Sequence, residues 1–80
     1  MDYSPVLVIL GKNIRRIRKA KKLTMEDLAF HANIEYRHIG RIERGEVNTT
    51  VVSLIRIAIF LNVDVRAFFE NLDLGSLSND

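Results

Sequence analysis

Residues 24–45 contain two short apolar repeats of helical period, separated by one residue that favours a turn. Thr24 is a good N-cap for the first helix, and Asp27 follows three residues later, near the positive end of that helix. The inner face of this helix consists of Leu28, Ala29 and Ala32. Asn33 then ends it, because Asn tolerates a positive φ better than any residue except Gly. The segment therefore predicts two helices that cross steeply, with the small Ala29 at their closest approach.

The second helix of this pair has an inner and an outer face. Ile39 and Ile42 point inward at i, i+3. The outer face consists of Tyr36, Arg37, Gly40 and Arg41. Arginine suits guanine best, because its planar fork matches the O6 and N7 acceptors in the major groove. We therefore expect a helix-turn-helix whose second helix, about 36–43, reads DNA bases through Tyr36, Arg37 and Arg41. The alternative for this face is a merely solvated polar surface.

The formal net charge of +2 is unevenly divided along the chain. Residues 11–44 carry +6, whereas the remaining residues together carry −4. A segment of this charge is suited to a polyanion, so we expect double-stranded DNA as the partner. The expected phosphate contacts are Lys12, Arg16, Lys19, Lys22, Thr24, His38 and Arg44. The alternative for the basic run 12–22 is the exposed face of a soluble helix.

The length of 80 residues fits one domain, which we assign to 1–80 with a core over about 5–72 and a frayed tail over 73–80. The chain has no Cys, which excludes disulfides, thiol nucleophiles and Cys-containing zinc sites. No apolar run is longer than Val6 to Leu10, which is too short to cross a membrane. We therefore expect a cytoplasmic protein without membrane contact.

No residue pattern indicates catalysis or a bound cofactor. His31 and His38 fall on different predicted helices without a carboxylate pair beside them, so no metal site is expected. His38 is expected instead at the rim of the DNA face, where it can meet phosphate. The chain has no Gly-rich phosphate loop and no Ser/His/Asp set with motif support. We expect no enzyme, no cofactor and no small-molecule ligand.

The first and third helices have clear boundary signals. Ser4 as N-cap and Pro5 at the first helical position predict a helix over about 5–21. Its core stripe is expected to be Val6, Leu10, Ile14 and Ile17. Gly45 is expected to end the reading helix as a C′ residue.

Two more helices are predicted after the reading helix. Thr50 caps a fourth helix over about 51–61, and Asn62 ends it in the left-handed region. The expected core face of this helix is Val51, Leu54, Ala58 and Leu61. Asp64 caps a fifth helix over about 65–72. Its expected anchors are Phe68 and Phe69. The chain is therefore predicted to be all-α, a compact five-helix bundle.

The fourth helix is more apolar than one buried face requires. Val52, Ile55 and Ile59 form a second apolar stripe beside its core face. A monomer seldom exposes such a patch, so we predict a homodimer joined through this stripe, with help from Phe69 and Leu72. The alternative is a wider contact within one molecule, with the first or the fifth helix.

Four stretches carry a resemblance to a known family: LGKNIRRIRKAKKLT, MEDLAFHANI, HIGRIERGEVN and SLIRIAIFLNVDVRAFF. They resemble the Cro/phage-repressor (xenobiotic-response-element) helix-turn-helix family over about residues 10–70. The resemblance implies a five-helix bundle that binds operator DNA, usually as a dimer, with its third helix in the major groove. It also implies an ion pair between Arg18 and Glu43 that joins the first helix to the reading helix. The size and layout further resemble the controller proteins of restriction–modification systems.

The chain departs from the pattern of this family at three places. Met25 stands where members commonly have Gln, so a backbone phosphate contact is lost there. Glu35 stands where Ser or Thr is common, and its charge repels nearby phosphate. Glu46 and Val47 stand where basic residues often follow the IERG turn. We expect a weaker phosphate grip at these points than in other members.

The sequence as a whole predicts a transcriptional regulator that binds a two-fold related operator as a dimer. Repression and activation both remain open. One alternative is a protein-interaction adaptor that uses the same bundle without DNA. Another is an antitoxin whose apolar stripe on the fourth helix meets a toxin.

Overall fold

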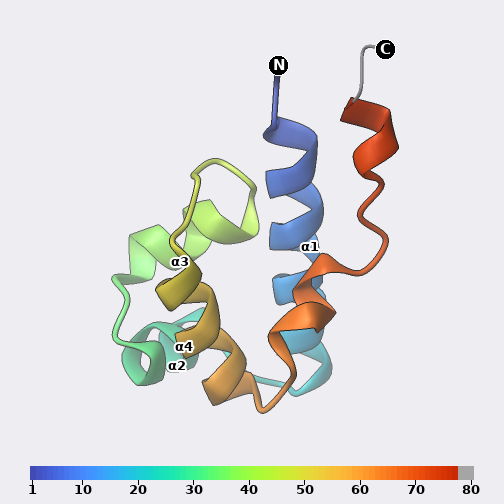
Figure 1. The fold of residues 1–80 in the computed structure, drawn as a ribbon. Helices are drawn as coiled ribbons and strands as arrows, with labels where there is room; N and C mark the ends of the chain where they lie inside the picture. Colours follow the sequence, from blue (N-terminus) through green and yellow to red (C-terminus); the bar gives the residue numbers. More distant parts are fainter. Residues whose placement is uncertain (78–80) are drawn as a thin grey trace.

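The structure is a computed structural model that describes residues 1–77. Its elements are α1 (Ser4–Ala20), α2 (Met25–Ala32), α3 (Tyr36–Glu43), α4 (Val51–Leu61) and the 3-10 helices η1 (Val65–Phe69) and η2 (Leu74–Leu77). Helix α1 packs against α3 and against η1, while α2 packs against both α3 and α4 (Figure 1). No strand occurs among the described residues, and the all-α prediction is confirmed.

The predicted fifth helix is wrong in type and length, because the chain forms only a short 3-10 turn at Val65–Phe69. Asn13 of α1 explains the difference. Its side-chain amide donates to the carbonyl oxygens of Phe68 at 2.9 Å and Glu70 at 2.8 Å. These carbonyls are needed to continue a helix, and Glu70 itself is extended at φ −61° and ψ 142°. Part of the predicted frayed tail forms η2, and its residues 78–80 lie outside the described residues.

Thr24, Thr50 and Asp64 cap the starts of α2, α4 and η1 as predicted, whereas α1 and α3 have no side-chain cap from their N-cap residues. Thr50 Oγ1 accepts from the N–H of Ser53 at 3.0 Å, and Asp64 Oδ1 accepts from the N–H of Arg66 at 2.9 Å. Ser4, in contrast, is not the N-cap of α1. It is the first helical residue, and its N–H donates to Asp2 Oδ1 at 2.9 Å. The carboxylate two residues earlier therefore takes over the capping bond.

Each of the four α-helices is followed by a residue in the left-handed region. Asn33 and Asn62 lie there at φ 55° and 56°, and Gly45 at φ 72°, as the sequence predicts. Lys22 also lies there, at φ 59° after α1, and this was not predicted, because a Lys is strained in the left-handed region. These residues turn the chain sharply enough for short connections between the helices.

The core lies between the four α-helices and η1. It consists of Leu10, Ile14, Ile17, Leu28, Ala29, Ala32, Ile39, Ile42, Leu54, Ile57, Ala58, Leu61 and Phe68. Three residues predicted to pack inside are placed wrongly: Val51, the first residue of α4, is 70% exposed, Phe69 is 42% exposed, and Val6 is only half-buried. Ile57 takes the place of Val51, because the inward face of α4 is Leu54, Ile57, Ala58 and Leu61 at i, i+3, i+4 and i+7.

Helix α3 approaches α1 closely at Gly11. A Cβ on Gly11 would lie 2.5 Å from the carbonyl oxygen of Glu43 and closer still to that of Ile42. Only a residue without a side chain therefore allows α3 to lie this close to α1.

Candidate nucleic-acid interface

The outward face of α3 brings the predicted base-reading residues together. Tyr36 is half exposed, and Arg37 and Arg41 are exposed. They line a groove of about 340 Å³, whose walls are completed by Met25, Gly40 and Arg44. The groove therefore has two cations and a phenol from one helix face, a set of donors suited to acceptors on base edges.

A second groove lies beside the first, between α1 and α3. Its volume is about 460 Å³, and its lining residues are Val8, Lys12, Arg15, Met25, Gly40, Glu43 and Arg44. Met25, Gly40 and Arg44 also line the first groove, so the two are continuous. A phosphate backbone following this double groove would meet cations from two helices.

Gly40 and Met25 form the boundary between the two grooves. A Cβ on Gly40 would lie 3.0 Å from Nη1 of Arg44 and 3.7 Å from the terminal methyl of Met25. Gly40 therefore leaves room for the guanidinium of Arg44 to lie along α3. Met25 is partly buried against the core, in agreement with the expectation that it only packs.

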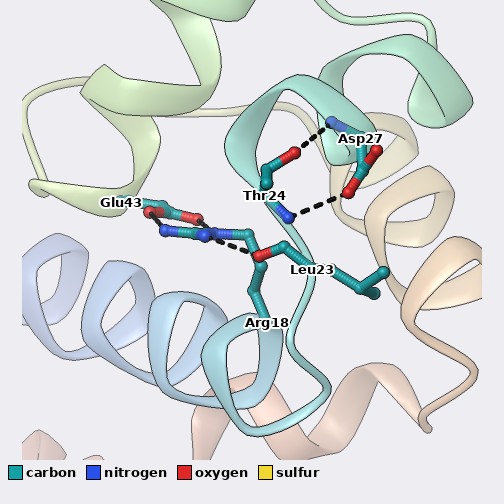
Figure 2. A network of polar contacts seen from close by, with 5 residues as sticks. All are labelled: Arg18, Leu23, Thr24, Asp27 and Glu43. Atoms are coloured by element: carbon teal, nitrogen blue, oxygen red, sulfur yellow. Dashed lines mark hydrogen bonds and ion pairs between the residues drawn. The ribbon is translucent and has the colours of Figure 1, made fainter.

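A buried ion pair fixes the reading helix to α1. Arg18 Nε and Nη2 donate to the two carboxylate oxygens of Glu43 at 2.7 and 2.9 Å (Figure 2). Arg18 Nη1 also donates to the carbonyl oxygen of Leu23 at 2.9 Å. Arg18 and Glu43 are only 7% and 5% exposed, and the hydrogen bond to Glu43 raises the pKa of Arg18. The pair that the family resemblance implied is thus present, and it also holds the connection to α2.

The start of α2 is fixed by a reciprocal pair of hydrogen bonds. The N–H of Asp27 donates to Thr24 Oγ1, and the N–H of Thr24 donates to Asp27 Oδ2, each at 3.0 Å (Figure 2). The bond from the Thr24 backbone lowers the pKa of Asp27. The sequence predicted the Thr24 cap but gave Asp27 only a role at the positive end of the helix.

An acidic residue lies directly beside two of the arginines predicted to contact DNA. Glu46 accepts from Arg44 Nε at 2.7 Å and lies 3.9 Å from Arg41 Nε. The hydrogen bond between Arg44 and Glu46 raises the pKa of Arg44 and lowers the pKa of Glu46. The chain therefore provides its own anion at the face expected to meet DNA.

The remaining predicted phosphate residues are spread around this face. Lys19 and Lys22 are exposed near the end of α1, and His38 is half-buried on α3. Arg16 is separate from them: its Nη2 lies 3.4 Å from the carboxylate of Glu70, where α1 packs against the C-terminal segment. The structure therefore brings Lys12 and Arg44 together and places Arg16 against a different part of the chain.

Arg15 is a candidate phosphate contact, and Asn13 a structural residue, that the sequence analysis did not predict. Arg15 lines the groove beside Lys12, and the signal for it was present, because residues 12, 15 and 19 repeat at i, i+3 and i+7. Asn13 had no comparable signal. Its buried amide has a role only once the carbonyls of η1 come within reach.

The apolar stripe of α4 lies on the surface. Val52, Ile55 and Ile59 are 58%, 43% and 73% exposed, and Phe69 of η1 is 42% exposed. Leu72 is half-buried. The residues predicted to join two subunits are thus accessible, whereas a wider core contact within one molecule does not cover them.

The two histidines do not form part of a metal cluster. His31 stacks on Phe60 with ring centroids 4.6 Å apart and meets the edge of Phe30 at 5.1 Å. No group of three or more possible metal ligands occurs among residues 1–77. In the same part of the chain, no helix is long and apolar enough to span a membrane.

The chain is similar to several known proteins in sequence and in fold. Over 63 residues the chain is 39% identical to control protein C.SmaI of Serratia marcescens, covering 79% of this chain and 75% of that protein. It is 36% identical over 58 residues to the immunity repressor protein of Bacillus phage phi105, covering 72% of this chain and 40% of that protein. The crystal structure of the restriction-modification controller protein C.AhdI of Aeromonas hydrophila matches with a TM-score of 0.77 and 35% identity, covering 79% of this chain and 96% of that chain.

The family assignment rests on most of the folded chain. Residues 14–68, from the middle of α1 to the end of η1, match the HTH_3 helix-turn-helix family. This span includes the capped α2, the turn at Asn33 and the whole reading helix. The chain therefore belongs to the HTH_3 helix-turn-helix family of Cro/C1 type and is a DNA-binding transcriptional regulator.

Proposed function

We propose that the protein binds a two-fold related operator as a homodimer, with α3 of each subunit in the major groove. The observation that carries the proposal is the exposed face of α3, where Tyr36, Arg37 and Arg41 line one groove. Arg37 and Arg41 supply bidentate contacts to guanine, and Tyr36 contacts a neighbouring base or sugar. Of these residues, the arginines carry most of the discrimination between base pairs.

The adjoining basic groove positions the subunit on the phosphate backbone. Lys12 and Arg15 of α1 face Arg44 across this groove, so a single strand can contact all three. Lys19, Lys22, Thr24 and His38 extend the contact along the same face. Arg16 is left out of this set, because it pairs with Glu70.

The apolar stripe of α4 joins the subunits. Val52, Ile55 and Ile59 form a self-complementary patch, and Phe69 and Leu72 extend it. A two-fold contact there sets two reading helices about 34 Å apart, one turn of DNA. Ile59→Glu places a charge in this contact and is expected to give folded monomers that bind an operator much more weakly. Sedimentation of wild type and variant at micromolar concentration tests this, and a variant that remains dimeric contradicts it.

Within the family, we assign the protein to the controllers of restriction–modification systems. C.SmaI and C.AhdI, both named as control proteins, match most of this chain and most of their own length. The protein then acts in the cytoplasm, with no cofactor and no chemistry of its own, and its concentration and dimerisation set its activity. An antitoxin differs in that the α4 stripe binds a toxin rather than a second copy.

Selection of bound duplexes from a random pool, followed by affinity measurements, tests the readout. Arg37→Ala and Arg41→Ala are each expected to cost about 1–3 kcal/mol on the selected duplex and to relax preference at particular base pairs. Arg66→Ala is the matched control, because Arg66 is an exposed arginine of η1 paired with Asp64. An unchanged ratio of selected to scrambled affinity in both α3 variants refutes the readout. Wild type without salt-dependent binding to any duplex indicates an adaptor instead.

A further inference from the structure

The turn that ends α3 brings an acidic residue back over the reading helix. The N–H of Gly45 donates to the carbonyl oxygen of Ile42 at 3.0 Å, and the N–H of Glu46 donates to that of Arg41 at 2.9 Å. With Gly45 in the left-handed region, these two bonds make a Schellman motif. The motif normally brings apolar residues together at the positions that Glu46 and Arg41 occupy here. The local fold of the chain therefore forces a carboxylate against an arginine.

The Glu46 carboxylate is shared by two guanidinium groups. Arg44 donates to it from Nε at 2.7 Å and from Nη2 at 3.4 Å, and Arg41 Nε lies 3.9 Å away. Both arginines line the groove on the outward face of α3. The backbone bond from Glu46 to Arg41 fixes the position of the carboxylate, and the pKa of Glu46 is lowered by Arg44, so the group remains ionised at neutral pH.

We propose that Glu46 is an internal competitor for DNA phosphate, which holds Arg44 by hydrogen bonds and Arg41 by a longer ion pair until DNA displaces it. The proposal rests on the proposed function, because it requires the α3 face to bind DNA. A phosphate uses the same edge of a guanidinium fork that Glu46 occupies on Arg44. In the complex with DNA, Arg44 must therefore either stay on Glu46 and make no phosphate contact, or leave Glu46 and bind phosphate. In the second case the Glu46 carboxylate is left unpaired beside the phosphates. Both routes weaken binding to every sequence alike.

The competition is readily reversible, because Arg44, Arg41 and Glu46 are all about half exposed. Exposed ion pairs are weak, so the expected effect of releasing them is modest. Glu46→Gln keeps the length and shape of the side chain but removes its charge. We expect it to bind a generic duplex about fivefold more tightly per subunit. The slope of log affinity against log salt should steepen by about 1 per subunit, because Arg44 becomes available to phosphate.

Three further variants, namely Asp64→Asn, Arg44→Gln and the double variant with Glu46→Gln, separate this mechanism from a general effect of charge. Asp64→Asn removes one acidic charge from another exposed ion pair, at the start of η1. In this pair Arg66 donates to the Asp64 carboxylate at 2.9 and 3.0 Å. The Asp64→Asn variant is expected to leave DNA affinity unchanged. Glu46→Gln in an Arg44→Gln background tests whether the effect acts through Arg44. A competitor predicts that most of the gain disappears there, whereas simple repulsion between Glu46 and phosphate predicts the same gain in both backgrounds.

Fluorescence anisotropy with a scrambled duplex, over a range of salt concentrations, measures all four proteins against wild type. Tighter binding by Glu46→Gln alone, with a steeper slope that depends on Arg44, supports the proposal. An affinity equal to that of Asp64→Asn, or a gain independent of Arg44, overturns it while the DNA-binding function stands. Wild type that binds no duplex overturns both.

Discussion

The buried pair between Arg18 and Glu43 makes a quantitative prediction about stability. Glu43→Gln keeps the shape of the side chain and one acceptor, but it leaves the Arg18 cation buried without a counterion. Breaking such a pair from one side costs about 3–5 kcal/mol. Because Arg18 keeps its bond to the carbonyl oxygen of Leu23, we expect the lower end, about 3 kcal/mol. A domain of 80 residues has roughly 4–12 kcal/mol of stability, so the variant loses a substantial part of it.

Urea unfolding followed by circular dichroism measures the effect. The midpoint should fall while the slope of free energy against urea stays constant, because the surface exposed on unfolding is unchanged. The double variant Arg18→Met with Glu43→Leu should recover most of the loss, since apolar residues of similar volume can replace a buried pair at little cost. Asp64→Asn, in an exposed pair, should leave the midpoint in place. A loss below about 1 kcal/mol for Glu43→Gln would show that the pair is effectively solvated and refute the reasoning.

Three further predictions follow from the packing, the basic groove and the cap of α2. Gly11→Ala should lower the free energy of unfolding in urea by at least about 3 kcal/mol, because the backbone of α3 occupies the place of the added Cβ. Gly40→Ala should be neutral or stabilise by up to about 1 kcal/mol through helix propensity, since only the flexible end of the Arg44 side chain must move. Arg15→Gln should make the salt slope of DNA binding shallower by about 1, and Arg16→Gln should leave it unchanged; equal slopes for both variants contradict the assignment. The pKa of Asp27 lies below its ordinary value of 3.8, so its cap stabilises α2 fully above that value and loses this effect as pH falls through the lower folded pKa. Unfolding free energies of wild type and Asp27→Ala should therefore converge on acidification, and a constant difference down to full protonation contradicts this.

The sequence alone determined where α2, α3 and α4 begin and end. Thr24 and Thr50 cap as predicted, and Asn33, Gly45 and Asn62 turn the chain as predicted. These signals are local, because a cap or a left-handed residue acts through backbone groups within a few positions. The helix-turn-helix, the all-α class and the outward face of α3 followed from these local signals and from helical periodicity.

The prediction of a fifth helix failed because a residue distant in the sequence binds its backbone. Residues 65–72 have the composition of a helix, but Asn13, more than fifty positions earlier, takes the carbonyl oxygens of Phe68 and Glu70. The chain is therefore held in a 3-10 turn followed by an extended residue. A hydrogen bond between residues so far apart has no counterpart in the local pattern, so only the tertiary structure could reveal it.

The tertiary structure also decided where the charges of the basic run lie. Arg15 and Arg16 are neighbours in one basic run, yet one lines the groove beside α3 and the other pairs with Glu70. Glu46 was expected only to weaken the phosphate grip, but it reaches Arg44 and Arg41. The sequence specifies the spacing of residues around each helix, whereas the direction that each face takes depends on the elements that pack beside it. For this reason the sequence predicted a basic reading face, and the packing of α1 between α3 and η1 determined which cations lie beside α3.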